Sequence, residues 1–580
     1  MAESAAASGV ASAQGIRDRV LKLPWWSSIK SSFFELFSKY TMHGYKNLVE
    51  NKRLAVEKFV WACMHFIAVY TSLWIVWSTW TEFTDNPTIT TLDNQNYPIK
   101  RIAFPAVGLC NINRISKYRA RKYAEYLSQK FVDSQAREGI QSEVTEEMIN
   151  DFYGKIRFLG RLLDFDIEGY EEFLSFQEQL EILDPDPTIE MWNVEKTFAD
   201  ISPTCDDLLL ICKFNDIEKN CSEYFTTRRT AFGYCCTFNF VRPRGSTFEL
   251  SGTPKYPAGI GDHAGLNVVV NTSTSDYYYP MANFAGALTL LYDTMEYPDI
   301  TTGNTRTEII DPSTENFIRI SINVYEADRE VKNYARDCKF KDEDFDEFKG
   351  RYTYTECLIK CKMRSIIDLC SCIPFFFPTN HADIVTNTTI RCTLQHVPCL
   401  NKYRIKWRTI TPSVQGINGL QQEYQDSLNC PQCFALCSYT QYKLETTFNP
   451  IIKNPDGGIL SKFKDISDLS IVRVFYASDT GFLYKISVTN TWYDLLSTFG
   501  GLFGLFLGFS IMTVLEMIYF LCFRMYQYLT KKFSDDEDDL KISIMKQMYP
   551  NKKFPHSYKE IERTLASGYN KKMNFVEYTE

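Results

Sequence analysis

The chain has 580 residues, long enough for more than one domain, and its net charge of −8 at pH 7 argues against the basic face that nucleic-acid binding needs. Its six histidines form no nucleophile motif or metal-ligand cluster, so the sequence argues against an enzyme and predicts no cofactor and no bound metal. Aromatic residues make up 15% of the chain and are concentrated in two apolar segments, residues 59–80 and 500–523.

The first apolar segment is predicted to be a membrane helix. Residues 59–80 contain no charged residue, and about 20 apolar residues suffice for a helix to cross a bilayer. Trp74, Trp77 and Trp80 cluster at one end, as expected at a membrane interface. The preceding tail, residues 1–58, holds more Lys and Arg than Asp and Glu, which predicts that it is cytoplasmic. No cleavable signal peptide is apparent, so the helix is expected to remain as an anchor.

The cysteines predict an extracellular domain. Of 18 cysteines, Cys63 and Cys522 fall in the apolar segments, and all others lie between Cys110 and Cys437. Disulfides persist in oxidising compartments, so this even set places residues 81–490 outside the cell. Three N-x-[ST] glycosylation sequons fall in the same region, at Asn220, Asn271 and Asn387.

The extracellular region is predicted to have a β core with helical insertions. Residues 99–116 have the pattern of a strand that leads into a turn, and residues 117–195 are charged and favour helices. Six later segments have the composition of strands. They are CCTFNFV, LNVVVNT, FIRISINVYEA, YTQYKLETTF, IVRVFYAS and FLYKISV. The predicted fold class is therefore membrane α+β, with two transmembrane helices flanking a large disulfide-rich domain.

The cysteines of residues 338–437 have a spacing that suggests two facing helices. Cys357 and Cys361 are four residues apart, as are Cys433 and Cys437, so each pair would occupy one helix face. Two antiparallel helices could be joined by nested disulfides, although spacing alone leaves the connectivity open. At roughly 2–4 kcal/mol for each bond, such a set predicts either a stiff rod or stabilisation without a mechanical role. The nested set is Cys338–Cys437, Cys357–Cys433, Cys361–Cys430, Cys370–Cys399 and Cys372–Cys392.

The second apolar segment, GGLFGLFLGFSIMTVLEMIYFLCF, carries regularly spaced glycines and a carboxylate. Gly500, Gly504 and Gly508 recur at every fourth position, a pattern that lets helices pack closely in lipid. Ser510 and Glu516 favour another interpretation, because polar groups within a membrane usually face water or a partner. Rings of such oxygens around a symmetry axis would suit a small cation. The segment therefore predicts a cation pore, with close packing as the alternative.

Several motifs, taken in order, resemble the degenerin/epithelial sodium channel family. In that family a Gly-x-Ser tract forms the narrow selectivity region and a glutamate follows it, a pattern that Gly508-Phe509-Ser510 and Glu516 match. The doubled cysteine of GYCCTFN and the Gly-Phe-Ser tract are most similar to insect pickpocket subunits. The resemblance extends from about residue 30 to residue 525. Its other motifs are His43-Gly44, FPAVGLCN, the cysteine series and LLSTFGG.

The resemblance implies a trimer of identical or homologous subunits. Each would have a hand-like ectodomain with a β-sheet palm, a helical finger and a disulfide-braced thumb at about residues 338–437. The implied activity is a sodium-selective, amiloride-sensitive, voltage-independent cation channel of the plasma membrane, opened by an extracellular stimulus. Na+ would be the permeant ion, lipid would surround the helices, and an unidentified extracellular ligand is a possible partner. Residues 491–523 would hold the pre-pore segment and second helix, followed by a cytoplasmic tail at 524–580.

The resemblance also implies roles for single residues. His43-Gly44 would line the cytoplasmic pore mouth and influence opening. Asp494 matches an outer-pore position, where it either attracts cations or caps the second helix, and the sequence leaves both open. The disulfides implied outside the thumb are Cys110–Cys235 and Cys212–Cys221, and elimination then adds Cys205–Cys236.

A receptor or adhesion protein is the alternative from a different functional class. Two spans that bracket a disulfide-rich domain fit a non-conducting protein with an extracellular ligand equally well. That alternative gives no role to Glu516 or to the glycines, and a recording of current discriminates between the two.

Overall fold

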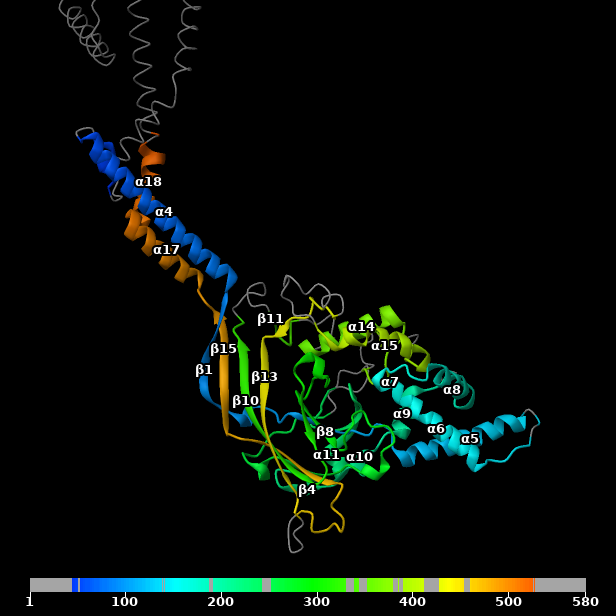
Figure 1. The fold of residues 1–580 in the computed structure, drawn as a ribbon. Coiled ribbons are helices and arrows are strands. Elements are labelled where there is room, and N and C mark those ends of the chain that lie inside the picture. The colour runs from blue at the N-terminus through cyan, green and yellow to red at the C-terminus, as the bar shows by residue number, and fades with distance from the viewer. Residues whose placement is uncertain are drawn as a thin grey trace, which may run out of the picture. The chain divides into compact units, whose positions relative to one another are not determined.

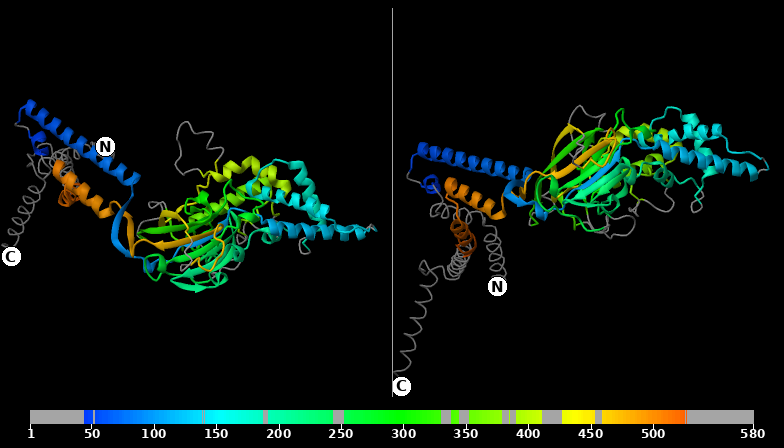
Figure 2. Two further views of the ribbon diagram at one scale, coloured as in Figure 1. Left: turned by 60° about the horizontal axis from the view of Figure 1, so that its bottom comes forward. Right: turned by 90° about the horizontal axis from the view of Figure 1, so that it is seen from below.

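The computed structural model describes residues 44–50, 53–137, 139, 141–186, 191–242, 252–329, 338–343, 352–378, 384, 390–410, 427–452, 459–524 and 526. The chain divides into two compact units. One unit is residues 88–488, and the other combines the segments on either side, 1–87 and 489–580. Figure 1 shows the ribbon coloured along the chain, and Figure 2 gives two further views.

An eight-stranded mixed sheet forms one layer of residues 88–488. Its strand β10, Thr314–Ala327, pairs with antiparallel β13 and also with parallel β14 and β15. Ile318, Ile320 and Ile322 are buried on one face of β10, because alternate side chains of a strand point the same way. The other strands are β1 (Thr88–Pro98), β3 (Leu209–Phe214), β4 (Ile217–Lys219), β7 (Leu266–Asn271), β13 (Ser438–Pro450), β14 (Leu469–Tyr476) and β15 (Thr480–Val488).

A five-stranded sheet, in the order β5-β6-β2-β8-β9, shares a buried core with the first sheet. Phe104, just before β2, lies at the centre of this core and meets three other aromatic rings edge-on. Its ring centroid is 5.4 Å from that of Phe214, 6.0 Å from Phe238 and 5.6 Å from Tyr476. The strands are β2 (Ala106–Asn111), β5 (Phe225–Thr230), β6 (Gly233–Phe238), β8 (Ala287–Tyr292) and β9 (Arg306–Ile310).

Helices from two distant parts of the chain share a second core. Phe198 of α9 stacks on Phe375, which follows α14, with ring centroids 4.1 Å apart. The long helices are α5 (Lys117–Arg137), α6 (Glu146–Ile156), α8 (Tyr170–Leu183), α9 (Val194–Ile201), α14 (Tyr354–Cys370) and α15 (Val397–Arg408). The shorter elements are α7 (Arg161–Asp164), α10 (Cys205–Leu208), α11 (Cys221–Tyr224), β11 (Cys338–Lys339) and β12 (Ala435–Leu436).

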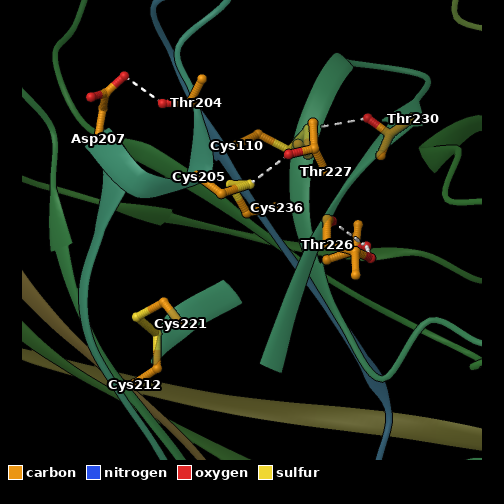
Figure 3. Close-up of a disulfide and its surroundings, with 12 residues drawn as sticks. Cys110, Thr204, Cys205, Asp207, Cys212, Cys221, Thr226, Thr227, Thr230 and Cys236 are labelled. Atoms are coloured by element: carbon orange, nitrogen blue, oxygen red, sulfur yellow. Dashed lines mark hydrogen bonds between the residues drawn. A yellow bond between two sulfur atoms is a disulfide. The ribbon is translucent and has the colours of Figure 1, made fainter. Parts of the chain in front are cut away.

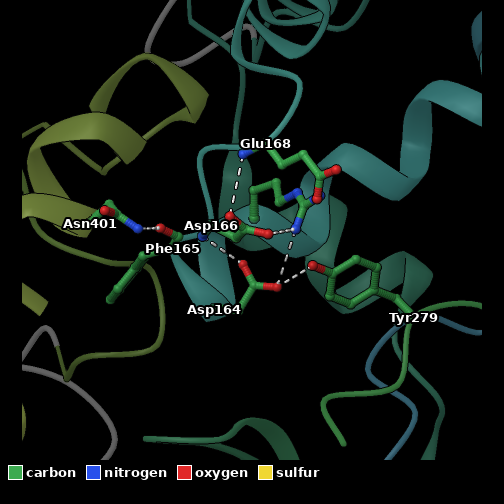
Figure 4. Close-up of polar contacts among 7 residues, drawn as sticks. Asp164, Phe165, Asp166, Glu168, Tyr279 and Asn401 are labelled. Atoms are coloured by element: carbon green, nitrogen blue, oxygen red, sulfur yellow. Dashed lines mark hydrogen bonds and ion pairs between the residues drawn. The ribbon is translucent and has the colours of Figure 1, made fainter. Parts of the chain in front are cut away.

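A polar cluster joins these two groups of helices (Figure 4). Asn401 of α15 donates a hydrogen bond to the carbonyl oxygen of Phe165 at 2.6 Å. Phe165 ends α7 in the left-handed conformation, with φ 59°. Arg161 pairs with Asp166 at 2.6 Å and holds the same loop. The loop after α7 is therefore fixed from both sides.

Most of the predicted elements are present. The six segments predicted as strands overlap β6, β7, β10, β13, β14 and β15, and the charged region 117–195 forms α5 to α8. The β-rich, disulfide-rich part of the predicted fold class is confirmed. Strand β1 was not predicted, because TITTLDNQNYP is mostly polar and lies largely exposed.

The prediction that Cys433 and Cys437 occupy one face of a helix is wrong. Cys433 donates its N–H to the carbonyl oxygen of Cys430 at 3.0 Å, which closes a turn, and β12 follows. Pro431 occupies the second position of this turn, where its fixed φ is favoured. The disulfides therefore link α14 to a non-helical segment.

Eight disulfides cross-link residues 110–437, and they join the same pairs that were expected from the sequence. Cys205 is bonded to Cys236, and its Sγ lies 3.1 Å from Thr227 Oγ1 (Figure 3). Cys63 and Cys522 are free. The full set is Cys110–Cys235, Cys205–Cys236, Cys212–Cys221, Cys338–Cys437, Cys357–Cys433, Cys361–Cys430, Cys370–Cys399 and Cys372–Cys392.

Two buried ion pairs fix α14 against the rest of residues 88–488. Arg242 donates to Glu356 from Nε at 2.6 Å and from Nη2 at 2.8 Å, and the two side chains are only 9% and 10% exposed. Lys362 donates to Asp299 at 2.6 Å. A buried charge that loses its partner is costly, so both pairs restrain the position of the helix.

Replacement of Glu356 tests this restraint. Glu356→Gln should lower the free energy of unfolding by about 3–5 kcal/mol, because Arg242 is left buried without its counter-charge. The thermal midpoint of the purified full-length chain measures the loss. Asp342→Asn removes the exposed pair with Arg329 and should leave the midpoint unchanged. Equal midpoints for the two variants would contradict the account.

The partners of the adjacent cysteines Cys235 and Cys236 can also be tested. If Cys110 and Cys205 exchanged partners, the same four residues would form two different disulfides. After unfolding without reductant, Cys63 and Cys522 react with maleimide in every variant. Cys205→Ala should add Cys236 to the labelled residues, whereas Cys110→Ala should add Cys235. Peptide mapping by mass spectrometry identifies the labelled residue. Label on the opposite cysteine in either variant would show that the pairing is wrong.

Candidate functional site

The described residues of the unit formed by the two ends of the chain include four helices and a π-helical segment. In the described part of the chain, one helix, α4, is long and apolar enough by itself to cross a membrane, and it extends beyond the predicted 59–80 at both ends. Helices α17 and α18 pass the same test only as a pair, with a bend of 72° between them. The elements are α3 (Tyr45–Val49), α4 (Ala55–Asp85), α17 (Trp492–Leu507), α18 (Ile511–Ile518) and η7 (Tyr519–Arg524).

The bend falls at Gly508-Phe509-Ser510, the tract predicted to form the selectivity region. Gly508 ends α17 with φ 65° and donates its N–H to the carbonyl oxygen of Gly504 at 3.0 Å. Phe509 donates to the carbonyl oxygen of Phe503 at 3.1 Å. This left-handed backbone is strained for any residue with a Cβ, so glycine at position 508 allows the chain to leave the helix.

Ser510 begins the next helix as its N-cap. Its Oγ accepts a hydrogen bond from the Thr513 N–H at 3.3 Å, and its own N–H donates to Thr513 Oγ1 at 2.7 Å. This reciprocal capping box satisfies donors that are otherwise unpaired at a helix start. The Ser510 side chain is exposed in the single chain, and its hydroxyl oxygen keeps a second lone pair. The oxygen can therefore also face an ion or water.

The other predicted pore residues lie before and after the break. A Cβ on Gly500 or Gly501 would meet no heavy atom of the described residues within 4 Å, apart from the helix itself. The surface of α17 at Gly500 and Gly501 is therefore not covered by the described residues, whereas a Cβ at Gly504 would lie 3.8 Å from the carbonyl oxygen of Phe509. The uncovered surface fits both a lumen and a neighbouring subunit. Glu516 is half-buried on α18, six residues beyond Ser510 and so about 9 Å farther along the helix.

Asp494 takes part in the cap of α17. The N-cap residue is Thr491, and both its N–H, at 2.9 Å, and its hydroxyl, at 2.5 Å, donate to Asp494 Oδ2. Asp494 is therefore the third residue of α17. The N-cap position that the sequence suggested for Asp494 is occupied by Thr491, three residues earlier. Its side chain remains exposed, so the capping role does not exclude an effect on cations.

The predicted gating pair is only partly described. His43 lies outside the described residues, and Gly44 begins α3 with φ 76°. A Cβ at Gly44 would lie 2.6 Å from Cε1 of His65 on α4. The left-handed backbone favours glycine at position 44, and a Cβ there would also force the His65 ring to shift.

Two of the three predicted glycosylation sites are described, and both lie at the ends of elements. Asn220 caps α11, where its Oδ1 accepts from the Ser222 N–H at 3.4 Å. Asn271 ends β7, and its Oδ1 accepts from the Ser273 N–H at 3.1 Å. Asn387 lies outside the described residues, and glycosylation at all three sites stays a prediction.

Sequence reasoning missed the division of residues 500–523 into two helices. The signal was present, because a serine with a hydrogen-bonding side chain three residues later marks a helix start. Ser510 and Thr513 have this spacing, and Gly508 supplies the stop signal just before them.

Comparisons with known proteins find relatives over most of the chain. A sequence model described as "Amiloride-sensitive sodium channel" matches residues 36–520. The sodium channel protein Nach of Drosophila ananassae is 22% identical over 515 residues, which cover 86% of this chain and 87% of the relative. Pickpocket protein 28 of Drosophila melanogaster is 22% identical over 555 residues, or 86% of this chain and 80% of the relative.

A vertebrate relative matches a smaller part of the chain. The epithelial sodium channel subunit gamma of Xenopus laevis is 24% identical over 329 residues, which cover 54% of this chain and 45% of the relative. Among solved structures, a proton-activated chloride channel overlaps 79% of this chain and 96% of its own with a TM-score of 0.26 and 5% identity, too low to indicate a shared fold. The family model spans most of the chain, and the resemblance to pickpocket proteins is confirmed. The chain belongs to the amiloride-sensitive sodium channel family.

Proposed function

We propose that the chain is a subunit of a trimeric, amiloride-sensitive, sodium-selective channel of the plasma membrane. The observation that carries the proposal is the break at Gly508-Phe509-Ser510, within a segment apolar enough to lie in a membrane. The names of the relatives, several of them sodium channel proteins, support the same conclusion. Homologous copies of the chain would supply the other two subunits.

The chemistry of the break suits a cation. Lipid offers no hydrogen bonds, so backbone groups at a break in a membrane helix need water, an ion or a protein neighbour. The carbonyl end of α17 carries partial negative charge, which favours cations. Three Ser510 side chains around a symmetry axis would add a ring of hydroxyl oxygens, which are suitable ligands for Na+.

The remaining residues fit the proposed topology. Helix α4 would be the first membrane crossing and α17 with α18 the second, so that residues 81–490 lie outside and both tails inside. Glu516 would face the aqueous lumen below the break, because a carboxylate in lipid is costly. Asp494 would raise the local cation concentration at the outer entrance. His43 and Gly44 would act at the cytoplasmic entrance.

Recording from cells that express the chain, alone and with homologous subunits, tests the proposed function. The cells should show an inward Na+ current that amiloride blocks, under at least one of peptide, mechanical or osmotic stimulation. Surface expression without current under every stimulus and subunit combination would favour the non-conducting receptor. In the same recordings, Ser510→Ala in every copy of the chain should lower the permeability ratio of Na+ to K+ about fivefold, equivalent to a change of about 1 kcal/mol in the preference for Na+. Ser497→Ala, an exposed hydroxyl on α17, should leave the ratio unchanged.

A matched pair of glycine variants tests the break itself. Gly508→Ala forces a Cβ onto a left-handed backbone, which costs roughly 1–2 kcal/mol, and should reduce the current or its selectivity. Gly501→Ala lies inside α17, where a Cβ meets open space and alanine favours the helix, so the current should persist. Equal surface levels, measured by biotinylation, make the comparison valid. Normal current from Gly508→Ala would contradict the role given to the break.

A further inference from the structure

Arg114 is a buried cation whose charge is not matched by an acidic partner. It lies just after β2, the residue is 5% exposed, and its Nε has no hydrogen-bond partner among the residues that the structure describes. The guanidinium carbon lies 6.0 Å from the centroid of the Phe232 ring, a weak cation–π contact. Among the described residues, no carboxylate forms an ion pair with Arg114, whereas the buried Arg242 has Glu356. An uncompensated buried charge costs several kcal/mol, so Arg114 needs an explanation.

The surroundings of Arg114 keep it charged. Burial lowers the pKa of the Arg114 guanidinium to about 10, which still leaves it protonated at neutral pH. The neighbouring phenol of Tyr277 is a weak acid and supplies no negative charge at that pH. The positive charge therefore persists within residues 88–488.

A small cavity lies against this charge. It has a volume of about 10 Å³, enough for roughly one water molecule or a small ion. Strands β2 and β6, helix α9 and the segment after α14 all contribute to its wall. Much of the lining is apolar, including Leu109, Phe198 and Phe375, so a large hydrated ion does not fit.

The polar groups around the cavity leave several donors available. Asn111 and Asn113 line it, and each amide nitrogen uses one N–H, toward the carbonyl oxygen of Thr272 at 3.1 Å and of Asp276 at 2.9 Å, so each keeps a second N–H. Ser202 also lines the cavity, and its hydroxyl forms no hydrogen bond with the described residues. The free hydrogen-bonding capacity is thus that of a guanidinium, a hydroxyl and two amide N–H groups, all of which can donate.

We propose that Arg114, the adjacent cavity and Ser202 form a binding site for one small inorganic anion of halide size. Chloride, the abundant halide of extracellular fluid, would be the physiological occupant. A water molecule could satisfy the hydrogen bonds but not the charge, whereas a halide does both. The bound ion would stabilise the junction at which the two sheets meet the helices.

Anion exchange at constant sodium concentration and ionic strength tests the proposal on the purified full-length chain. The thermal midpoint should rise by at least about 2 °C when gluconate is replaced by chloride, because a ligand that binds only the folded state stabilises it. Bromide should replace chloride, and sulfate should not. Arg114→Met should abolish the difference between chloride and gluconate, and Ser202→Ala should reduce it.

A matched variant and a structural measurement complete the test. Arg404→Met removes an exposed arginine on α15 and should retain the full chloride effect. Crystals or grids of the unaltered chain in bromide should show the ion within hydrogen-bonding distance of the Arg114 guanidinium, whether or not Arg114→Met folds. Identical midpoints of the unaltered chain in chloride and gluconate would overturn the proposal. So would a chloride effect that Arg114→Met retains, or a bromide structure with water at this position.

Discussion

A helix in lipid must satisfy its own backbone hydrogen bonds, and in the proposed channel this constraint would govern the second apolar segment. The segment interrupts its hydrogen bonding at Gly508 and resumes it at Ser510, within residues that are otherwise strongly apolar. The turn at left-handed Gly508 and the Ser510–Thr513 capping box satisfy some of the backbone groups that lose their helical hydrogen bonds at the break. The remaining carbonyl and hydroxyl oxygens need water, an ion or a protein neighbour. The proposed cation pathway follows from the need of these oxygens for a partner.

Buried charged groups in residues 88–488 also need partners. Its buried charges are paired where α14 meets its neighbours, through Arg242 with Glu356 and Lys362 with Asp299. Disulfides at both ends of α14 restrain the same helix covalently. Arg114 departs from this pattern because its charge lies beside a cavity instead of a carboxylate. A halide bound in that cavity would give Arg114 a negatively charged partner, as Arg242 and Lys362 have.

Elements with a clear residue pattern along the chain were predictable from the sequence. The alternating isoleucines of β10 specify a strand with one buried face, and the confined, even set of cysteines indicates a disulfide-rich domain. Failures have local physical causes. Polar β1 gives no hydrophobic alternation, Pro431 favours a turn where cysteine spacing suggested a helix, and overall hydropathy conceals the Gly508–Ser510 break. The cavity beside Arg114 was not predictable, because residues from distant segments form it.

The most direct test of the central claim is the accessibility of Ser510 to water. In a background with Cys63 and Cys522 replaced by serine, Ser510→Cys can be probed with a small charged thiol reagent during current recording. Leu505→Cys, on the exposed apolar surface of α17, serves as the comparison. The account predicts rapid modification and block at position 510, protected by amiloride or by Na+, and slow modification at position 505. A cysteine at position 510 that never reacts from either side, in channels that still conduct, would contradict the account.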